Sequence, residues 1–165
     1  MANAAISYTA LVNWKRHPDI ATAFGEMVLA WANAENVMLF TFSHAAQIDA
    51  NLALLTYYRI PTFEARTKVI VSLLSEPKCQ LANRTVVLAA AEKLAKLAQA
   101  RNAWIHGNFW TDGKTVVSFD YRLQSHKPRT RPIKSNDLNI HVDAVRQRTK
   151  DLEALLPMEP YFASP

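Results

Sequence analysis

The stretch VVLAAAEKLAKLAQA, residues 86–100, decides the fold class, because alanine, leucine and lysine are strong helix formers and follow one another here without a break. The helix that it predicts begins near Gln80 or Asn83 and ends at His106. Gly107 is a typical stop signal directly after that end. The apolar residues of this segment fall on one stripe, so the helix is expected to pack against other helices.

Apolar residues at helical spacing predict further helices on both sides of this segment, over about 19–46, 49–58, 61–75 and 136–156. In the helix over about 49–58, Leu52, Leu55 and either Tyr57 or Tyr58 are expected to face inward. Strands are expected at 108–110 and 115–123 around the turn Asp112-Gly113, with a third near 131–134. The predicted fold class is all-α: an antiparallel helical bundle of about five helices, with a small β-hairpin inserted before the last helix.

A chain of 165 residues is about one domain long, and we expect a single domain over 1–165. Its predicted parts are a loose arm (1–17), a helical bundle (19–106), the hairpin with a basic loop (108–134), the last helix (136–156) and a tail (157–165).

Composition narrows the function classes. The net charge of +5 favours polyanionic partners, and three glycines in all exclude glycine-rich phosphate loops. The single cysteine, Cys79, cannot form an internal disulfide. We see neither a membrane-spanning run nor a secretory signal, and we expect a cytoplasmic protein. The histidines show no metal-ligand spacing, so we expect no metal site and no cofactor.

Three charged residues stand in the middle of apolar stripes: Glu35 and Arg66 in their helices, and Arg101 among Val87, Leu94 and Leu97 in the fourth. Burying an unpaired charge costs several kcal/mol, roughly, so these positions predict a polar network. One carboxylate cannot neutralise two guanidinium groups. If Glu35 pairs with Arg66, Arg101 is left either to receive a phosphate or to extend its charged group to the end of the bundle. The alternatives are that Glu35 pairs with Arg101, or that all three satisfy one another.

The segment Arg101-Asn102-Ala103-Trp104-Ile105-His106 carries the candidate catalytic residues. At 100° per residue, Arg101 and His106 point about 140° apart, so one helix cannot easily aim both at the same atom. A second copy of the chain would complete such a site. Asn102 and His106 are neighbours at i and i+4, and Asn102 is placed either to orient the imidazole or to share a ligand oxygen.

This segment resembles the R-x(4–6)-H signature of the HEPN superfamily (higher eukaryotes and prokaryotes nucleotide-binding domains), in the form Arg-Asn-x-x-x-His. The resemblance covers about 19–106 and the last helix. It implies a metal-independent endoribonuclease, often a toxin or antiviral defence effector, that acts as a homodimer with a composite site. An antitoxin or defence partner protein is then expected. Some toxins of the superfamily carry a tyrosine two residues after the histidine, where this chain has Asn108.

The resemblance assigns roles to three residues. His106 takes the proton from the ribose 2′-hydroxyl or returns one to the leaving 5′-oxygen. Arg101 stabilises charge on the phosphorane, and Asn102 holds the histidine or the phosphate. The expected products carry 2′,3′-cyclic phosphate and 5′-hydroxyl ends.

Basic residues cluster directly after this segment, with aromatic residues before them. Base stacking combined with phosphate contacts is typical of single-stranded nucleic-acid binding. The RNA-binding candidates are Arg122, Lys127, Arg129, Arg131, Lys134 and Trp110. The competing interpretations are a non-catalytic HEPN-like module that binds RNA or nucleotide or serves as a scaffold, and a plain structural bundle.

Overall fold

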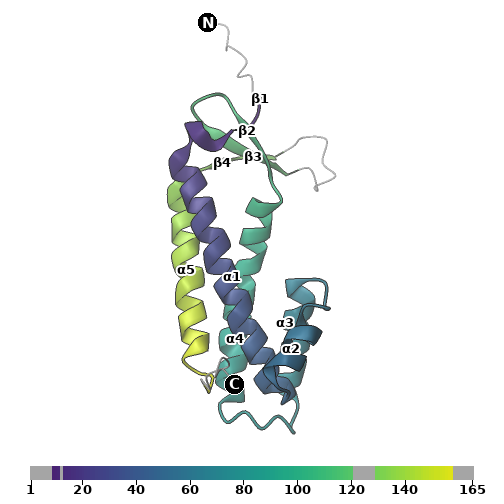
Figure 1. The fold of residues 1–165 in the computed structure, drawn as a ribbon. Helices are drawn as coiled ribbons and strands as arrows, with labels where there is room; N and C mark the ends of the chain where they lie inside the picture. The colour runs from purple at the N-terminus through teal and green to yellow at the C-terminus, as the bar shows by residue number, and fades with distance from the viewer. Residues whose placement is uncertain (1–8, 12, 121–128, 158–165) are drawn as a thin grey trace, which may run out of the picture. The chain divides into compact units, whose positions relative to one another are not determined.

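The computed structural model describes residues 9–11, 13–120 and 129–157. Within them, the chain forms five α-helices and a small four-stranded antiparallel sheet, so the predicted fold class is confirmed (Figure 1). The helices are α1 (Pro18–Ala46), α2 (Ala50–Tyr57), α3 (Phe63–Ser75), α4 (Arg84–Ile105) and α5 (Ser135–Glu153). The strands are β1 (Thr9–Ala10), β2 (Asn108–Thr111), β3 (Val116–Asp120) and β4 (Arg129–Ile133), and a 3-10 helix, η1, covers Trp14–Arg16.

The chain groups into two compact units, each made of separate segments. We call Met1–Val28 with Gln99–Val142 the sheet unit, and Leu29–Ala98 with Asp143–Pro165 the helical unit. Because α1, α4 and α5 each extend from one unit into the other, neither unit is a continuous piece of sequence. A single domain over 1–165 therefore stays a prediction.

The sheet of the sheet unit has the strand order β1-β2-β3-β4, with every neighbouring pair antiparallel. Within the described residues, the predicted strands lie close to their expected positions, and residues 121–123 of the second one lie outside the described part. Gly113 has the positive φ of 91° that the turn between β2 and β3 requires. The Asp112 side chain accepts hydrogen bonds from the backbone N–H groups of Lys114 and Thr115 in this turn. These hydrogen bonds hold the pKa of Asp112 below its usual range.

The prediction of a loose arm over 1–17 is wrong where the structure describes it. Thr9 and Ala10 form a fourth strand against Thr111 and Trp110, and η1 follows. His17 is buried, with its Nε2 atom 3.4 Å from the hydroxyl oxygen of Thr111. The predicted tail is described only at Pro157, which is exposed.

In the helical unit, local capping sets where α2 and α3 begin. The Asp49 side chain accepts hydrogen bonds from two backbone N–H groups at the start of α2, and the Thr62 hydroxyl accepts one from the backbone N–H of Ala65 at the start of α3. Pro61, the residue at which we expected this helix to begin, precedes that cap and lies outside the helix.

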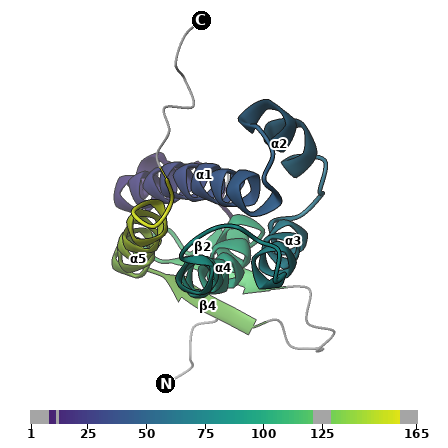
Figure 2. The same cartoon turned by 90° about the horizontal axis from the view of Figure 1, so that it is seen from below.

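The core of the helical unit follows the apolar stripes of α1 and α4, but not that of α2. Trp31, Met38 and Phe42 of α1 are buried, and the buried stripe of α4 within this unit is Val87, Ala91, Leu94 and Ala98. Of the residues expected to face inward, Tyr57 is buried, but the expectation is wrong for Leu52 and Leu55, because α2 buries only Ala53 and Tyr57. Figure 2 shows α2 at the edge of this unit, outside the group formed by its other helices.

Candidate functional site

The candidate catalytic residues lie in the last turn of α4 and directly after it. Arg101 is half-buried, and its Nη1 atom donates a hydrogen bond to Oδ1 of Asn102 at 2.9 Å. His106 is exposed directly after the helix, and its backbone N–H donates to the carbonyl oxygen of Asn102 at 3.1 Å. The Asn102 side chain thus orients the guanidinium group, and the imidazole remains accessible to solvent.

A close backbone approach sets where His106 lies on the sheet. A β-carbon at Gly107 would stand 2.5 Å from the Ser118 hydroxyl oxygen and 3.1 Å from the carbonyl oxygen of Ala103. Only glycine fits this position without a shift of its neighbours, so the turn that carries His106 lies directly on β3. Figure 1 shows β2 continuing from the end of α4 at this junction.

The register of the sheet places a basic residue, Arg131, beside Ser118 and so near the turn that carries His106. Ser118 of β3 pairs with Phe109 of β2 on one side and with Arg131 of β4 on the other. Neighbouring strands lie about 4.8 Å apart, which places Arg131 about 10 Å from Phe109 across Ser118. Arg131 is exposed. Among the RNA-binding candidates that the structure describes, it is the one that pairs with Ser118, the residue in contact with the turn after His106.

An aromatic hollow lies beside the end of α4 in the same unit. The rings of Trp14, Phe24 and Phe109 pack edge to face, with 5.3 Å between each pair of ring centroids. With Trp104 and Ile105 they line a hollow of about 340 Å³. The sequence carries no signal for this feature, because Trp14 and Phe24 meet Phe109 from distant segments.

The structure does not bring the remaining RNA-binding candidates that it describes to the turn that carries His106. Lys134 is exposed just before α5, and Trp110 is half-buried and paired with Val117, so it lies on the sheet face opposite to Phe109. Arg129 is described as a backbone position of β4 only. Arg122 and Lys127 lie outside the described residues.

Glu35 and Arg66 form the polar network of the helical unit. Arg66 Nη1 lies 3.0 Å from Glu35 Oε2, and the Tyr57 hydroxyl donates to the same oxygen at 3.1 Å. Arg66 Nε donates to the carbonyl oxygen of Ile60 at 2.9 Å. Burial raises the pKa of Tyr57, and the neighbouring Glu35 carboxylate adds to the effect, so Tyr57 stays a hydrogen-bond donor. Of the two arginines considered as partners of Glu35, the structure pairs it with Arg66.

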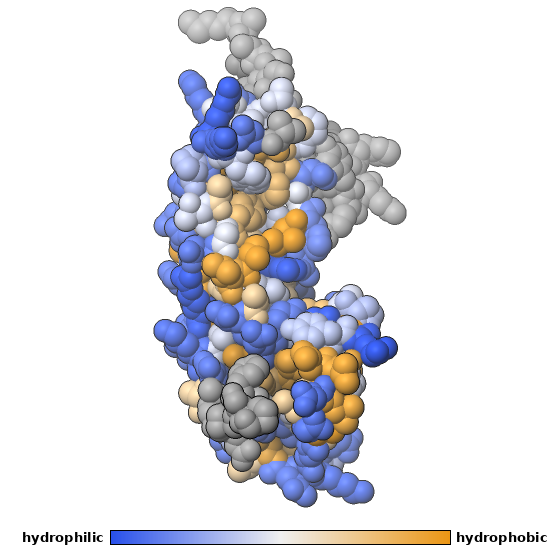
Figure 3. Space-filling view, viewed as in Figure 1, coloured by the Kyte–Doolittle hydropathy of each residue, from blue (hydrophilic) through white to orange (hydrophobic). Residues whose placement is uncertain are grey.

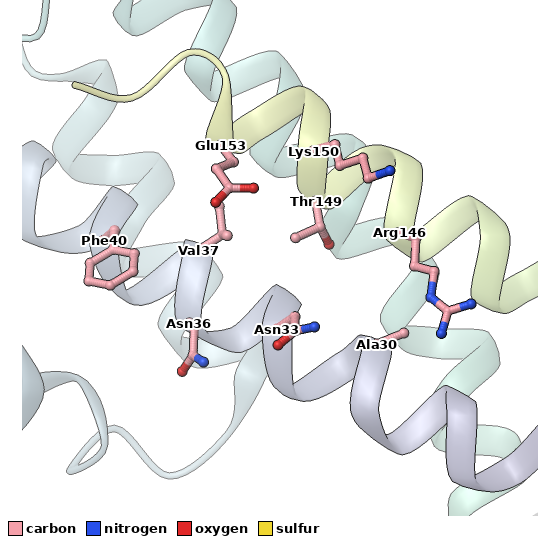
Figure 4. Close-up of a pocket in the computed structure, with 9 residues that line it drawn as sticks. All are labelled: Ala30, Asn33, Asn36, Val37, Phe40, Arg146, Thr149, Lys150 and Glu153. Atoms are coloured by element: carbon pink, nitrogen blue, oxygen red, sulfur yellow. The ribbon is translucent and has the colours of Figure 1, made fainter. Parts of the chain in front are cut away.

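The helical unit also contains a groove of about 420 Å³ between α1 and α5 (Figure 4). Asn33 and Asn36 line it from α1, and Lys150 and Glu153 line it from α5. Figure 4 shows Glu153 and Thr149 extending from α5 toward α1. The charged residues of its lining all come from α5 and are two cations, Arg146 and Lys150, and one carboxylate, Glu153.

Comparison with known proteins gives no match among family models, curated proteins or solved structures. In the part of the chain that the structure describes, no three His, Cys, Asp or Glu side chains come close enough to hold a metal ion. No helix in that part is long and apolar enough to cross a membrane. Cys79 is a half-buried free thiol.

Proposed function

We propose that this chain is a HEPN-like, metal-independent endoribonuclease with a composite active site between two copies. The observation that carries the proposal is the end of α4, where an exposed imidazole follows an arginine that is oriented by the neighbouring asparagine. Two further observations support the proposal: Gly107 contacts Ser118, and Ser118 pairs with Arg131. Together they place an exposed cation on the part of the sheet next to the turn that carries His106.

The proposed reaction is an in-line transesterification. His106 of one copy takes the proton from the ribose 2′-hydroxyl, and the 2′-oxygen attacks the adjacent phosphorus. The bond between phosphorus and the 5′-oxygen breaks, and His106 of the other copy gives a proton to that oxygen. The products are a 2′,3′-cyclic phosphate and a 5′-hydroxyl.

Arg101 stabilises the charge that develops on the phosphorane oxygens, because its planar guanidinium matches phosphate geometry. Asn102 acts here as a positioning residue for Arg101. The directions of Arg101 and His106, about 140° apart on one helix, are the reason to involve a second copy. Arg131 and the other basic residues contact the RNA backbone, and the aromatic hollow accepts an unpaired base. We place this activity in the cytoplasm, as that of a toxin or defence effector with a controlling partner protein.

The test is cleavage of single-stranded RNA in the presence of EDTA. Arg101→Ala and His106→Ala should each lower the cleavage rate by at least about a hundredfold. This is the lower end of what a group that stabilises transition-state charge contributes, and also of what a general acid or base contributes. Lys96→Ala, which removes an exposed charge from the same helix, is the matched control and should cleave at the parent rate. Circular dichroism should show unchanged helix content in all three.

The outcomes separate the proposal from its alternatives. Cleavage by both variants at the parent rate would show that the site is wrong. Salt-sensitive RNA binding without cleavage by the parent protein would identify the non-catalytic module instead. If Arg101→Ala lowered only thermal stability, Arg101 would be a structural residue.

A further inference from the structure

Helix α2 exposes an apolar face to solvent. The exposed fractions are 61% for Leu55, 48% for Leu52, 47% for Leu54 and 47% for Tyr58. Figure 3 shows hydrophobic surface gathered over this helix. Single exposed leucines are ordinary, but three on one helix of eight residues, with a tyrosine directly after it, form a contiguous patch of the kind that marks interaction sites.

The inner side of α2 is fixed in place by polar contacts. The Tyr57 hydroxyl is bonded to Glu35, and the Arg66 guanidinium lies 4.9 Å from the Tyr57 ring centroid and 5.0 Å from that of Tyr58. Asp49 caps the first turn. The outward leucines are therefore displayed on a preorganised element, which lowers the entropic cost of binding a partner.

The charges around this face are self-complementary. No residue from Ala50 to Tyr58 is charged, whereas Asp49 stands at the start of the helix and Arg59 directly after its end. Both are exposed, and neither has an ion-pair partner in the described part of the chain. Two such helices packed antiparallel would bring Asp49 of each copy to Arg59 of the other, with the leucines between them.

We propose that the outward face of α2 pairs with the α2 of a second copy about a two-fold axis. The inference goes beyond the proposed function, because α2 belongs to the helical unit, whereas Arg101 and His106 belong to the sheet unit. The exposed face of α2 and the charges beside it carry the inference on their own. The three leucines and Tyr58 are about half-exposed and together present roughly 350 Å² of apolar surface per copy. This area is less than half of what one partner buries in a standard protein–protein interface. The dimer is therefore concentration-dependent, and each Asp49–Arg59 pair adds up to about fivefold to its affinity.

The first experiment compares two single variants by sedimentation velocity over a range of protein concentrations. Leu55→Glu places a charge in the centre of the face and should give only monomer. Ile140→Glu is the matched control, because Ile140 is also 61% exposed but lies on α5, and this variant should dimerise like the parent. A parent protein that stays monomeric at all concentrations, or a Leu55→Glu variant that still dimerises, would overturn the proposal.

A second experiment tests the two-fold geometry. In a Cys79→Ser background, Leu55→Cys should form a disulfide-linked dimer on mild oxidation, because residues near a two-fold axis meet their own copies. Ile140→Cys should not. Binding of monomeric parent protein to phospholipid vesicles, with loss of that binding in Leu55→Glu, would assign the face to a lipid surface and would also overturn the proposal.

The RNA-cleavage assay keeps this inference separate from the proposed nuclease. Monomeric Leu55→Glu that cleaves RNA at the parent rate would retain the α2 pairing but remove the composite site. A parent protein that dimerises through α2 and does not cleave RNA would leave the pairing intact and remove the nuclease.

Discussion

Gly107 and Ser118 lie in direct contact where α4 meets the sheet, so close that a β-carbon on Gly107 would stand 2.5 Å from the serine hydroxyl oxygen. Gly107→Ala should therefore overpack this junction and lower the free energy of unfolding by about 1–3 kcal/mol. Removing the hydroxyl in Gly107→Ala/Ser118→Ala should recover part of the loss. Chemical denaturation of the single and double variants measures both effects.

Gly25 provides the matched control for that substitution. It lies within α1, and a β-carbon there would meet no atom within 4 Å. Gly25→Ala should raise the free energy of unfolding by about 0.5–1 kcal/mol, because alanine loses less conformational entropy in a helix. Equal effects of the same sign at Gly25 and Gly107 would contradict the close contact with Ser118.

The pair of Glu35 and Arg66 predicts a second difference in stability. Their side chains are 18% and 13% exposed, so Arg66→Ala leaves a mostly buried carboxylate without its cation. We expect a loss of about 3 kcal/mol in the free energy of unfolding. Tyr57→Phe removes only one neutral donor to Glu35 and should cost about 1 kcal/mol. Urea denaturation measures the free energy of unfolding of both variants. A smaller loss of stability in Arg66→Ala than in Tyr57→Phe would contradict the ion pair as the main contribution to this network.

Local signals in the sequence predicted most of the helical fold. Propensity and apolar periodicity gave the course of α1 and α4, and the Asp112-Gly113 turn gave the hairpin. The same kind of signal could not find β1, because a strand of two residues depends on its pairing with Thr111 and Trp110 rather than on its own composition.

The error at α2 has a different cause. Leu52 and Leu55 follow an apolar pattern that normally faces a core, yet the helix turns Ala53 and Tyr57 inward. The contact of Tyr57 with Glu35 and Arg66 decides this orientation, and it joins segments far apart in the sequence. Charges placed within apolar stripes did indicate a polar network, but only the fold shows which charges meet.

In the candidate site, too, some features could be predicted from the sequence and others depend on the fold. The spacing of Arg101, Asn102 and His106 could be recognised along the chain. The contact of Gly107 with Ser118, and the aromatic hollow to which Trp14 contributes, depend on the sheet and on η1. Such contacts between distant segments leave no periodic signal in the sequence.

His141 predicts a dependence of stability on pH. Its ring is buried edge to face against Trp104, with 4.8 Å between ring centroids, and within the described residues its Nε2 atom has no hydrogen-bond partner. Burial lowers the pKa of His141 below its usual value, so below about pH 6.5 the unfolded state binds more protons than the folded state. Stability should therefore fall as the pH drops through this region.

Thermal denaturation of His141→Phe tests this origin. Phenylalanine keeps a ring against Trp104 but cannot be protonated, so the variant should lose less stability than the parent between about pH 7 and pH 5. His106→Gln removes an exposed histidine and should retain the parent's slope. Identical slopes for the parent and His141→Phe would assign the acid sensitivity to other groups.

Arg131 predicts the salt dependence of RNA binding. The residue is exposed on β4, next to Ser118 and hence near the turn that carries His106. If it contacts one phosphate, Arg131→Gln should weaken binding to all RNA sequences alike and reduce the slope of log K against log salt by roughly 0.7, the value for one contact to a single strand. Lys68→Gln, on α3 of the helical unit, removes the same charge and should leave the slope unchanged. Fluorescence anisotropy titrations at several salt concentrations measure both slopes. An equal reduction in the two variants would mean that RNA responds to the net charge of the protein, and the sheet would then have no special role in holding the substrate near His106.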